Sequence, residues 1–324
     1  MRPAPGPAAL AYTRVMNVLI RAVLASVAVL VGGTAGSAPV HAAAARAAAD
    51  APGGAGVPPV LRMDLSGPIG PATADFFART LERAQQQQAG ALLVRMDTPG
   101  GLDGAMRDIV QAILASPVPV ITWVAPGGAR AASAGTYILY ASHVAAMAPG
   151  TNLGAATPVQ IGGMPGLPRP GGDAAPGGGD GDADEPAADP PAGDAMTHKM
   201  VNDAAAYLRA LAELRGRNAK WAERAVREAA SLPAAQAVRE GVVDLLAADE
   251  TAVLAAVDGR EVSTAAGPVV LRTAHARVEG VNPDWRTRLL AVLTNPSVAY
   301  MLMLVGIYGL VFEFMNPGAV VPGV

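Results

Sequence analysis

The chain has 324 residues, of which 51% are hydrophobic and only 16% charged; its formal net charge is −3 and it contains no cysteine. This length allows one large domain or two small ones, and the apolar composition indicates membrane-embedded parts. The slight negative charge argues against a nucleic-acid-binding protein, which would carry a basic field. The lack of cysteine excludes disulfides, thiolate metal sites and a cysteine nucleophile.

Residues 1–42 are predicted to be an export signal peptide. Arg14 and Arg21 precede a short apolar run, Ala22–Val31, and small residues follow, ending in "APVHAAAA". This pattern is typical of a cleavable secretory signal, and the run is shorter than the about 20 residues that a membrane-spanning helix needs. An uncleaved anchor is the alternative. Residues 43–57 are then an Ala/Gly/Pro-rich linker that we expect to be disordered.

Residues 58–275 are predicted to form one α/β domain with largely parallel strands, because strand and helix patterns alternate. The first helix should bury Phe76, Phe77, Leu81 and Ala84, and the second Leu102, Met106, Ile109, Val110 and Ile113, all at helical spacing. In chain order, the pattern predicts a strand over Val60–Ser66, a helix within "GPIGPATADFFARTLERAQQQQAG", a buried strand "ALLVRMD" before a Pro-Gly-Gly turn, a helix "LDGAMRDIVQAILAS", a strand "PVPVITWVA", a glycine loop and helix "GGARAASAGTYILYAS", and a short strand and turn in "HVAAMAPGTNLGAATPV".

The alternation stops at residues 161–195, which are almost all Gly, Pro, Asp and Ala. Such a segment buries no apolar surface, so we expect a disordered insertion that serves as a linker or as an active-site lid. Helical patterns resume near Thr197 and include a strand near "VVDLLA". The segment "AGPVVLRTAHARVEGV" is predicted to be a β-ribbon that closes the domain.

The C-terminal part is predicted to attach the chain to a membrane. Residues 276–295 form a juxtamembrane segment in which "DWRTRLLAVL" is amphipathic enough to lie on a membrane surface. Residues 296–314 are apolar over the length of a transmembrane helix, with Tyr300 and Tyr308 placed for the interfaces. A buried hydrophobic hairpin is the alternative. Residues 315–324 read "MNPGAVVPGV", which suggests the start of a further membrane segment and a truncated frame.

Ser133 is a candidate nucleophile because its neighbours are small. Alanine and glycine surround it in "ARAASAGT", and a helix is expected to start directly after it. A serine nucleophile needs access, a base and fixed donors for the oxyanion. The backbone N–H of Ala134 is one such donor, and the Gly100–Gly101 pair after a parallel strand can turn bare amides towards a ligand. The alternative is that Ser133 is only a helix N-cap.

The base is harder to assign than the nucleophile. His41 belongs to the signal region, His275 follows late in the chain, and His143 opens a strand ten residues after Ser133, where a structural role is expected. Lysine can act as a base where burial lowers its pKa towards neutrality. The chain has two lysines: Lys220 in a charged helix typical of the surface, and Lys199 beside His198 at the start of a helix. A surface role for Lys199 is the alternative.

Three blocks of the sequence resemble the membrane-bound ClpP-class serine proteases of the NfeD family. They are "MDTPGGLDGAMRDIVQAIL", "ASAGTYILYASHVAAMAPGTNLGAATPV" and "NDAAAYLRALAELRGRNAKWAERAVREAASLPAAQAV", in that order, and the similarity covers residues 60–324. The resemblance implies a ClpP/crotonase-like superhelix of ββα units and an endopeptidase with a Ser–Lys dyad. It also implies a stomatin-like membrane protein as partner and a hydrophobic segment as substrate. We expect no cofactor, metal or nucleic acid, a homo-oligomer (a dimer), and a protease domain on the extracytoplasmic, periplasmic side of the membrane.

Carried over residue by residue, the resemblance places the nucleophile on Ser133 and an oxyanion amide on Gly101. Some members of the family carry the lysine in the frame of Arg209, and arginine cannot lose its proton at working pH. Lys199 lies ten residues earlier, about 15 Å along one helix, and is the expected base. Gly100 and Thr136 are predicted to contact substrate. Two rival hypotheses are a catalytically inactive scaffold of the same fold and a crotonase-like acyl-CoA enzyme, against which the export signal argues.

Overall fold

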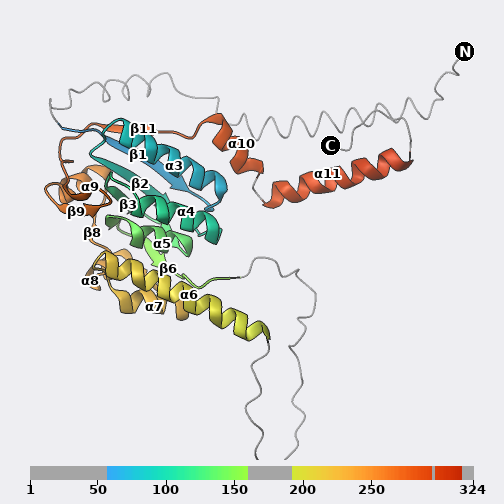
Figure 1. Cartoon of the computed structure of the whole chain (residues 1–324), viewed down its shortest axis with the longest axis horizontal. Helices are drawn as coiled ribbons and strands as arrows, with labels where there is room; N and C mark the ends of the chain where they lie inside the picture. Colours follow the sequence, from blue (N-terminus) through green and yellow to red (C-terminus); the bar gives the residue numbers. More distant parts are fainter. Residues whose placement is uncertain (1–56, 160–191, 294–295, 316–324) are drawn as a thin grey trace, which may run out of the picture. The chain divides into compact units, whose positions relative to one another are not determined.

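The computed structural model describes residues 57–159, 192–293 and 296–315 (Figure 1). The predicted signal peptide, residues 43–56 of the linker, residues 161–191 of the insertion and residues 316–324 lie outside the described residues. Residues 192–195, which were predicted to belong to the insertion, form the first turn of a helix instead.

The main sheet has six strands, all parallel, in the order β11-β1-β2-β3-β5-β8. In β1, Val60 pairs with Ala91 on one side and with Val278 on the other. The parallel α/β class is therefore confirmed, and the predicted strand over Val60–Ser66 has the observed bounds. The strands are β1 (Val60–Ser66), β2 (Ala91–Asp97), β3 (Val120–Val124), β5 (Val144–Met147), β8 (Leu245–Leu246) and β11 (Val278–Val281).

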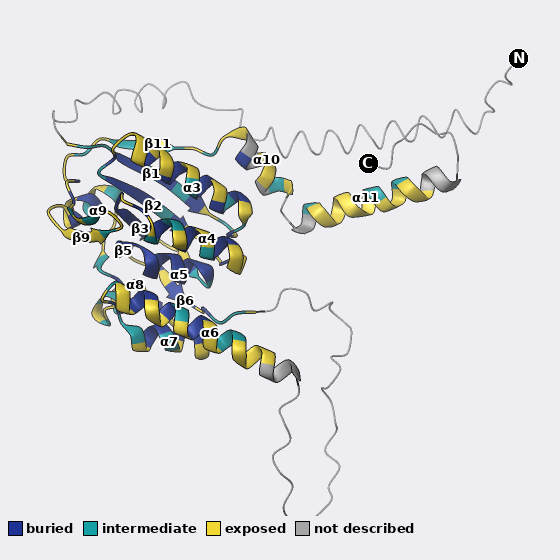
Figure 2. Cartoon of the chain, viewed as in Figure 1, coloured by how far each residue is buried: buried dark blue, intermediate teal, exposed yellow. Residues whose placement is uncertain are grey.

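Side chains alternate along these strands between two hydrophobic cores, and β1, β2 and β3 are mostly buried (Figure 2). Leu92 and Val94 of β2 face the larger core, whereas Ala91 and Leu93 face the smaller one, as the period of two in a strand requires. The larger core is covered by α3 (Pro71–Gln86), α4 (Asp103–Leu114) and α5 (Ala134–Ala141), and the smaller by α9 (Glu250–Val257) with the hairpin of β9 (Glu261–Thr264) and β10 (Gly267–Val270). The predicted apolar faces are buried, except for Leu102, which is 47% exposed because it is the N-cap of α4 and not part of its face.

A second, three-stranded sheet lies beside Ser133. It contains β4 (Arg130–Ala132), β6 (Asn152–Gly154) and β7 (Ser231–Pro233), in that order. Residues 130–132 were predicted to be a glycine loop; they form a strand because Ala132 pairs in register with Gly154 and Ala131 bridges to Thr98. The helices α6 (Ala192–Leu214), α7 (Ala219–Arg227) and α8 (Ala234–Arg239) follow in the same part of the molecule (Figure 1).

The end of the domain differs from the predicted ribbon. In this region β9 and β10 form an antiparallel hairpin, whereas β11 pairs parallel to β1 at the edge of the main sheet. The predicted domain boundary at residue 275 therefore falls before a strand that belongs to the same sheet.

Two helices complete the described chain: α10 (Trp285–Leu293) in the predicted juxtamembrane segment and α11 (Pro296–Met315) in the predicted transmembrane segment. Over the described residues, no helix combines the length and the apolar character needed to cross a membrane. The helix predicted over residues 296–314 is present, but its assignment as a transmembrane helix is not confirmed.

Candidate active site

Ser133 occupies the N-cap position of α5 in an unusual backbone conformation. Its φ is 50° and its ψ is −117°, and its side chain makes no capping hydrogen bond. A positive φ in a residue other than glycine costs about 1–3 kcal/mol and persists only where the surrounding structure enforces it. The side chain is partly exposed. The hydroxyl is therefore not used as a helix cap, which was the alternative role for this serine.

Hydrogen bonds with Thr136 and Gly154 hold this conformation. The backbone N–H of Ser133 donates to the Gly154 carbonyl at 2.9 Å, and the hydroxyl of Thr136 lies 3.1 Å from the same oxygen. The Thr136 hydroxyl also lies 2.8 Å from the Ala131 carbonyl and accepts from the Gly154 amide at 3.1 Å. Thr136 is fully buried, so the predicted contact of its side chain with substrate is wrong. Its role is to position the start of α5.

The turn after β2 lies directly against Ser133. A Cβ on Gly100, where φ is +115°, would lie 2.7 Å from the Cβ of Ser133 and 3.3 Å from its Oγ, so only glycine allows this approach. The Gly100 carbonyl accepts from Ile69 at 2.8 Å, and its amide donates to the Thr98 hydroxyl at 3.0 Å. Gly100 is buried and both of its polar groups are engaged, so the structure does not support its predicted contact with substrate.

Two amides beside the Ser133 hydroxyl are not engaged. Among the residues that the structure describes, neither the N–H of Gly101 nor the N–H of Ala134 donates a hydrogen bond to an acceptor. Ala134 begins α5, where the first N–H groups of a helix have no partner within the helix. Gly101 is the next residue after Gly100 and is exposed. One unengaged donor follows Ser133 in the chain and the other follows Gly100, which packs against Ser133; unengaged donors are what a developing oxyanion requires.

Gly135, the last residue of the "ASAG" block, has to be small because of its close neighbours. A Cβ at this position would lie 2.6 Å from the Thr98 methyl group and 3.2 Å from the Met96 sulfur. The first turn of α5 therefore packs directly on the end of β2, which brings the Gly100–Gly101 turn to the helix start.

The opposite end of α5 is fixed by two arginines. Arg217 Nη1 donates to the carbonyls of Leu139 and Tyr140 at 3.1 and 2.7 Å, and Arg215 Nε donates to that of Ala141 at 2.8 Å. These carbonyls are among the last four of the helix, which have no partner within it. Arg217 is itself paired with Asp244 at 2.6 Å. Burial alone would raise the pKa of Asp244, but Arg217 and the amide of Ala145 outweigh it and lower that pKa.

His143 has the expected structural role. It is 6% exposed, and its Nδ1 accepts from the backbone N–H of Val120 at 3.0 Å. Burial, with the charges of Arg215 and Arg217, lowers the pKa of His143 to about 3. The imidazole is neutral in the folded protein and points into the structure, so it is not the base for Ser133.

The contact between two helices shows which residues of α6 lie on the side of Ser133. Tyr137, one turn into α5, brings its hydroxyl 3.4 Å from the carbonyl of Ala204, and Arg215, just beyond α6, contacts the end of α5. The two helices therefore run in the same direction. Lys199 lies five residues before Ala204, as Ser133 lies four residues before Tyr137, so Lys199 is on the Ser133 side of this contact; its side chain is exposed.

Arg209 lies on another side of α6. Its guanidinium approaches Glu223 of α7 at 3.8 Å. On the neighbouring turns, Asp203 of α6 pairs instead with Arg107 of α4 at 2.8 Å, and Arg107 lies 4.6 Å from the ring centroid of Tyr207. Arg107 also pairs with Asp103 at 2.8 Å, two residues after Gly101. The first half of α6 is thus held against the start of α4, on the side of the Gly100–Gly101 turn.

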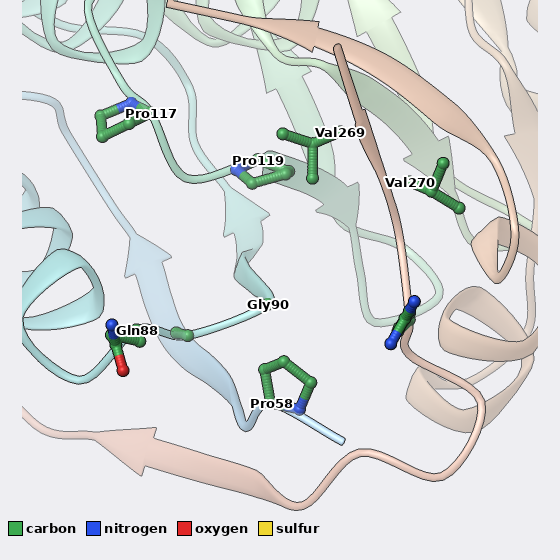
Figure 3. Close-up of a pocket in the computed structure, with 9 residues that line it drawn as sticks. Pro58, Gln88, Gly90, Pro117, Pro119, Val269 and Val270 are labelled. Atoms are coloured by element: carbon green, nitrogen blue, oxygen red, sulfur yellow. The ribbon is translucent and has the colours of Figure 1, made fainter. Parts of the chain in front are cut away.

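A separate hollow lies where the parallel strands of the main sheet begin (Figure 3). Pro58, Gly90 and Pro119, which precede the parallel strands β1, β2 and β3, are among the residues that line its volume of about 430 Å³. Parallel sheets bind ligands at the carboxyl ends of their strands, where Ser133 and Gly101 lie. The hollow is therefore at the other end of the sheet and contributes nothing to this site.

Comparison with known proteins identifies relatives of this chain. The family model described as NfeD1b, N-terminal domain, matches residues 60–165. The chain is 35% identical over 264 residues to Membrane-bound protease PH1510 of Pyrococcus horikoshii, a match that covers 80% of this chain and 53% of that protein. It is 40% identical over 84 residues to Membrane protein NfeD1b of Bacillus subtilis, covering 26% of this chain and 18% of that protein. The chain thus spans about half the length of the first of these relatives.

Solved structures match over a larger share. One is the 1510-N membrane-bound stomatin-specific protease, a lysine-to-alanine mutant in complex with a substrate peptide; it is 32% identical, with a TM-score of 0.61, and the match covers 74% of this chain and 99% of that one. A serine-to-alanine mutant of the same protease is 33% identical, with a TM-score of 0.59 and coverage of 70% and 99%. The chain therefore belongs to the NfeD family, together with the membrane-bound stomatin-specific protease of Pyrococcus horikoshii.

Proposed function

We propose that this chain is a membrane-associated serine endopeptidase in which Ser133 is the nucleophile and Lys199 the base. One observation carries the proposal: a serine in a strained conformation, without a capping bond, is flanked by the unengaged amides of Gly101 and Ala134. Backbone strain of this kind gathers at functional sites. Membership of a family whose relatives are named proteases supports the same reading.

The proposed reaction uses these groups in the following order. The uncharged amine of Lys199 takes the proton of the Ser133 hydroxyl as Oγ attacks the substrate carbonyl carbon. The carbonyl oxygen becomes an oxyanion, which accepts from Gly101 and Ala134. The ammonium of Lys199 then protonates the leaving amine as the C–N bond breaks, which leaves an acyl-enzyme. A water molecule, deprotonated by Lys199, hydrolyses the ester and restores the hydroxyl.

Lys199 is exposed in the structure, so the bound substrate has to exclude water from around it. An apolar substrate segment does this best, because it removes water from the amine without offering it a counter-charge. This requirement agrees with the relative that is named specific for a stomatin homolog. We propose a stomatin-like membrane protein as partner and a hydrophobic segment of it as substrate.

The same proposal includes the finer fold and the cellular setting. It assigns the parallel sheet and the second, smaller sheet to a ClpP/crotonase-like superhelix of ββα units. It places the protease domain at the extracytoplasmic, periplasmic face of a membrane, as a homodimer. The names of the relatives, membrane-bound protease and membrane protein, support the membrane setting.

The chain offers matched variants for a test. Wild-type protein should react with a fluorophosphonate probe and cleave an apolar peptide, and Ser133→Ala should lose both activities. Lys199→Ala should lose cleavage, whereas Lys220→Ala, which removes the other lysine, should keep it. Cleavage by Lys199→Ala would overturn the base and leave the nucleophile standing. Wild-type protein that neither reacts nor cleaves would be the inactive scaffold instead.

A further inference from the structure

The helix α10 is tied to the protease domain through one arginine. Arg79 of α3 donates from Nη2 to Thr287 Oγ1 at 2.6 Å and from Nη1 to Asp284 Oδ2 at 3.2 Å. Its Nε donates to Asp75 at 3.0 Å on the preceding turn of α3. Asp284 in turn accepts from the amide and hydroxyl of Thr287 at 2.9 and 2.6 Å, which closes the first turn of α10. We call these four residues the Arg79 latch.

The latch turns the polar side of α10 towards the protein. Thr287 is only 6% exposed, whereas Leu289 and Leu293 are 46% and 45% exposed. Trp285, which precedes Leu289 by four residues and shares its side of the helix, is 69% exposed. A surface helix of a soluble domain normally buries its apolar side against its own core. In α10 the arrangement is reversed, since a polar group is buried and the apolar side faces outward.

The chain continues from this apolar side into a second exposed apolar helix. Two residues after α10, α11 begins and runs for 20 residues. Its large apolar side chains between Tyr300 and Val311 are about half exposed or more, among them Leu302, Leu304 and Val305 at 53%, 49% and 56%. An outward apolar surface that extends over consecutive helices and includes tryptophan fits the interface of a lipid bilayer. Arg286 and Arg288 place two positive charges in the same short helix, as membrane-surface helices commonly do.

We propose that α10 lies in the surface of a phospholipid bilayer while the Arg79 latch holds it against α3, so that the catalytic domain takes a fixed orientation at the membrane. The inference rests on the membrane association proposed above. Each leucine that leaves water for the acyl boundary contributes favourably through its apolar area. The polar latch keeps its own hydrogen bonds on the protein side of α10, so docking on lipid does not break them.

The natural tryptophans report on this contact directly. The chain has three, and Trp123 and Trp221 are 6% and 1% exposed inside the domain, so lipid-borne quenchers can reach Trp285 alone. The full chain is bound to phosphatidylcholine–phosphatidylglycerol vesicles whose lipids carry bromine either near the headgroup or near the end of the acyl chain. We expect quenching by the shallow bromine and little by the deep one, with complete loss of quenching in Trp285→Phe.

Matched variants separate α10 from α11. Leu289→Ser combined with Leu293→Ser should abolish shallow quenching, whereas Leu214→Ser, which changes a 61% exposed leucine of α6, should not. Vesicle-bound protein without shallow quenching would overturn the inference and leave membrane association intact. Protein that does not bind the vesicles would overturn both.

The latch has its own test because the chain has no cysteine. Glu82→Cys on α3 and Leu293→Cys on α10 give two unique sites for spin labels. The distance distribution between the labels should be narrow on vesicles and should broaden in Arg79→Ala but not in Arg83→Ala, which changes a neighbouring arginine outside the latch. A distribution that Arg79→Ala leaves unchanged would overturn the fixed orientation.

Discussion

Gly101→Ala tests the oxyanion amide by moving it. A Cβ at this position would lie 2.0 Å from the carbonyl oxygen of Ile69 and 2.5 Å from its nitrogen, both of which are backbone atoms that cannot rotate away. Ordinary contact begins at 3.4 Å, so the two backbones have to separate by about 1.4 Å. The separation strains the bonds that join them, from Ile69 to Gly100 at 2.8 Å and from Leu102 to Ile69 at 2.9 Å.

The kinetic cost follows from this displacement. A misplacement of about 1 Å at a catalytic group costs roughly 100-fold in rate, which corresponds to about 2.7 kcal/mol of transition-state stabilisation. We therefore expect kcat/KM for peptide cleavage to fall at least about 100-fold in Gly101→Ala. The strained backbone bonds should also lower the free energy of unfolding by about 1–3 kcal/mol. Steady-state kinetics on an apolar peptide, with thermal denaturation followed by circular dichroism, measure the two effects separately.

Gly104→Ala is the matched control, three residues further on. No atom lies within 4 Å of a Cβ at Gly104, which sits in the first turn of α4. This variant should keep wild-type kcat/KM and gain about 0.5–1 kcal/mol of stability, because alanine loses less backbone entropy in a helix. If folded Gly101→Ala protein cleaves the peptide as fast as Gly104→Ala does, the Gly101 amide is not an oxyanion donor.

Three further variants test the scaffold of the site. Ser133→Gly should abolish cleavage yet raise the free energy of unfolding by about 1 kcal/mol in denaturant titrations, because glycine adopts the positive φ without strain; a loss of stability would contradict the strain. Arg217→Ala should lower the free energy of unfolding by about 1–3 kcal/mol, since it removes the donor of the Leu139 and Tyr140 carbonyls and leaves Arg260 as the charged partner of Asp244; unchanged urea denaturation would refute that role. In the folded chain the pKa of His143 is about 3, below its value of about 6.5 in the unfolded chain. As pH falls below about 6.5 the unfolded state takes up the proton first, so the free energy of unfolding decreases. His143→Asn, which keeps an acceptor for Val120, should flatten the dependence of stability on pH between these two values; an unaltered slope would show that other groups cause it.

The main sheet and its helices were predictable because their signals are local. The strand Val60–Ser66 alternates at a period of two, and its bounds were predicted as observed. Phe77 and Leu81 recur at helical spacing, and both are buried in α3. In these elements the spacing of apolar residues along the chain indicates which side faces a core.

The surroundings of Ser133 were not predictable in the same way, since distant partners decide them. The strand β4 has three residues and exists because Thr98 and Gly154 pair with it from either side. Thr136 lies three residues from Ser133 in an apolar block, and the sequence offers no sign that its hydroxyl points inward to Gly154. A positive φ at Ser133 also leaves no trace in the sequence, because serine is common at helix starts in an ordinary extended conformation.

The contacts of α6 bear on the choice between two candidate positions for the base. Some members of the family carry the lysine in the frame of Arg209, so the sequence alone leaves two candidate positions for the base, Arg209 and Lys199. Arginine does not lose its proton and cannot act as the base. Where Tyr137 meets Ala204, Lys199 lies five residues before Ala204 and Arg209 five residues after it. Because α5 and α6 run in the same direction, Lys199 is the one on the Ser133 side of this contact. The ion pair of Arg209 with Glu223 of α7 accounts for its charge without any part in the chemistry. An arginine in that frame is thus compatible with the proposed protease, in which the base is Lys199, ten residues earlier on the same helix.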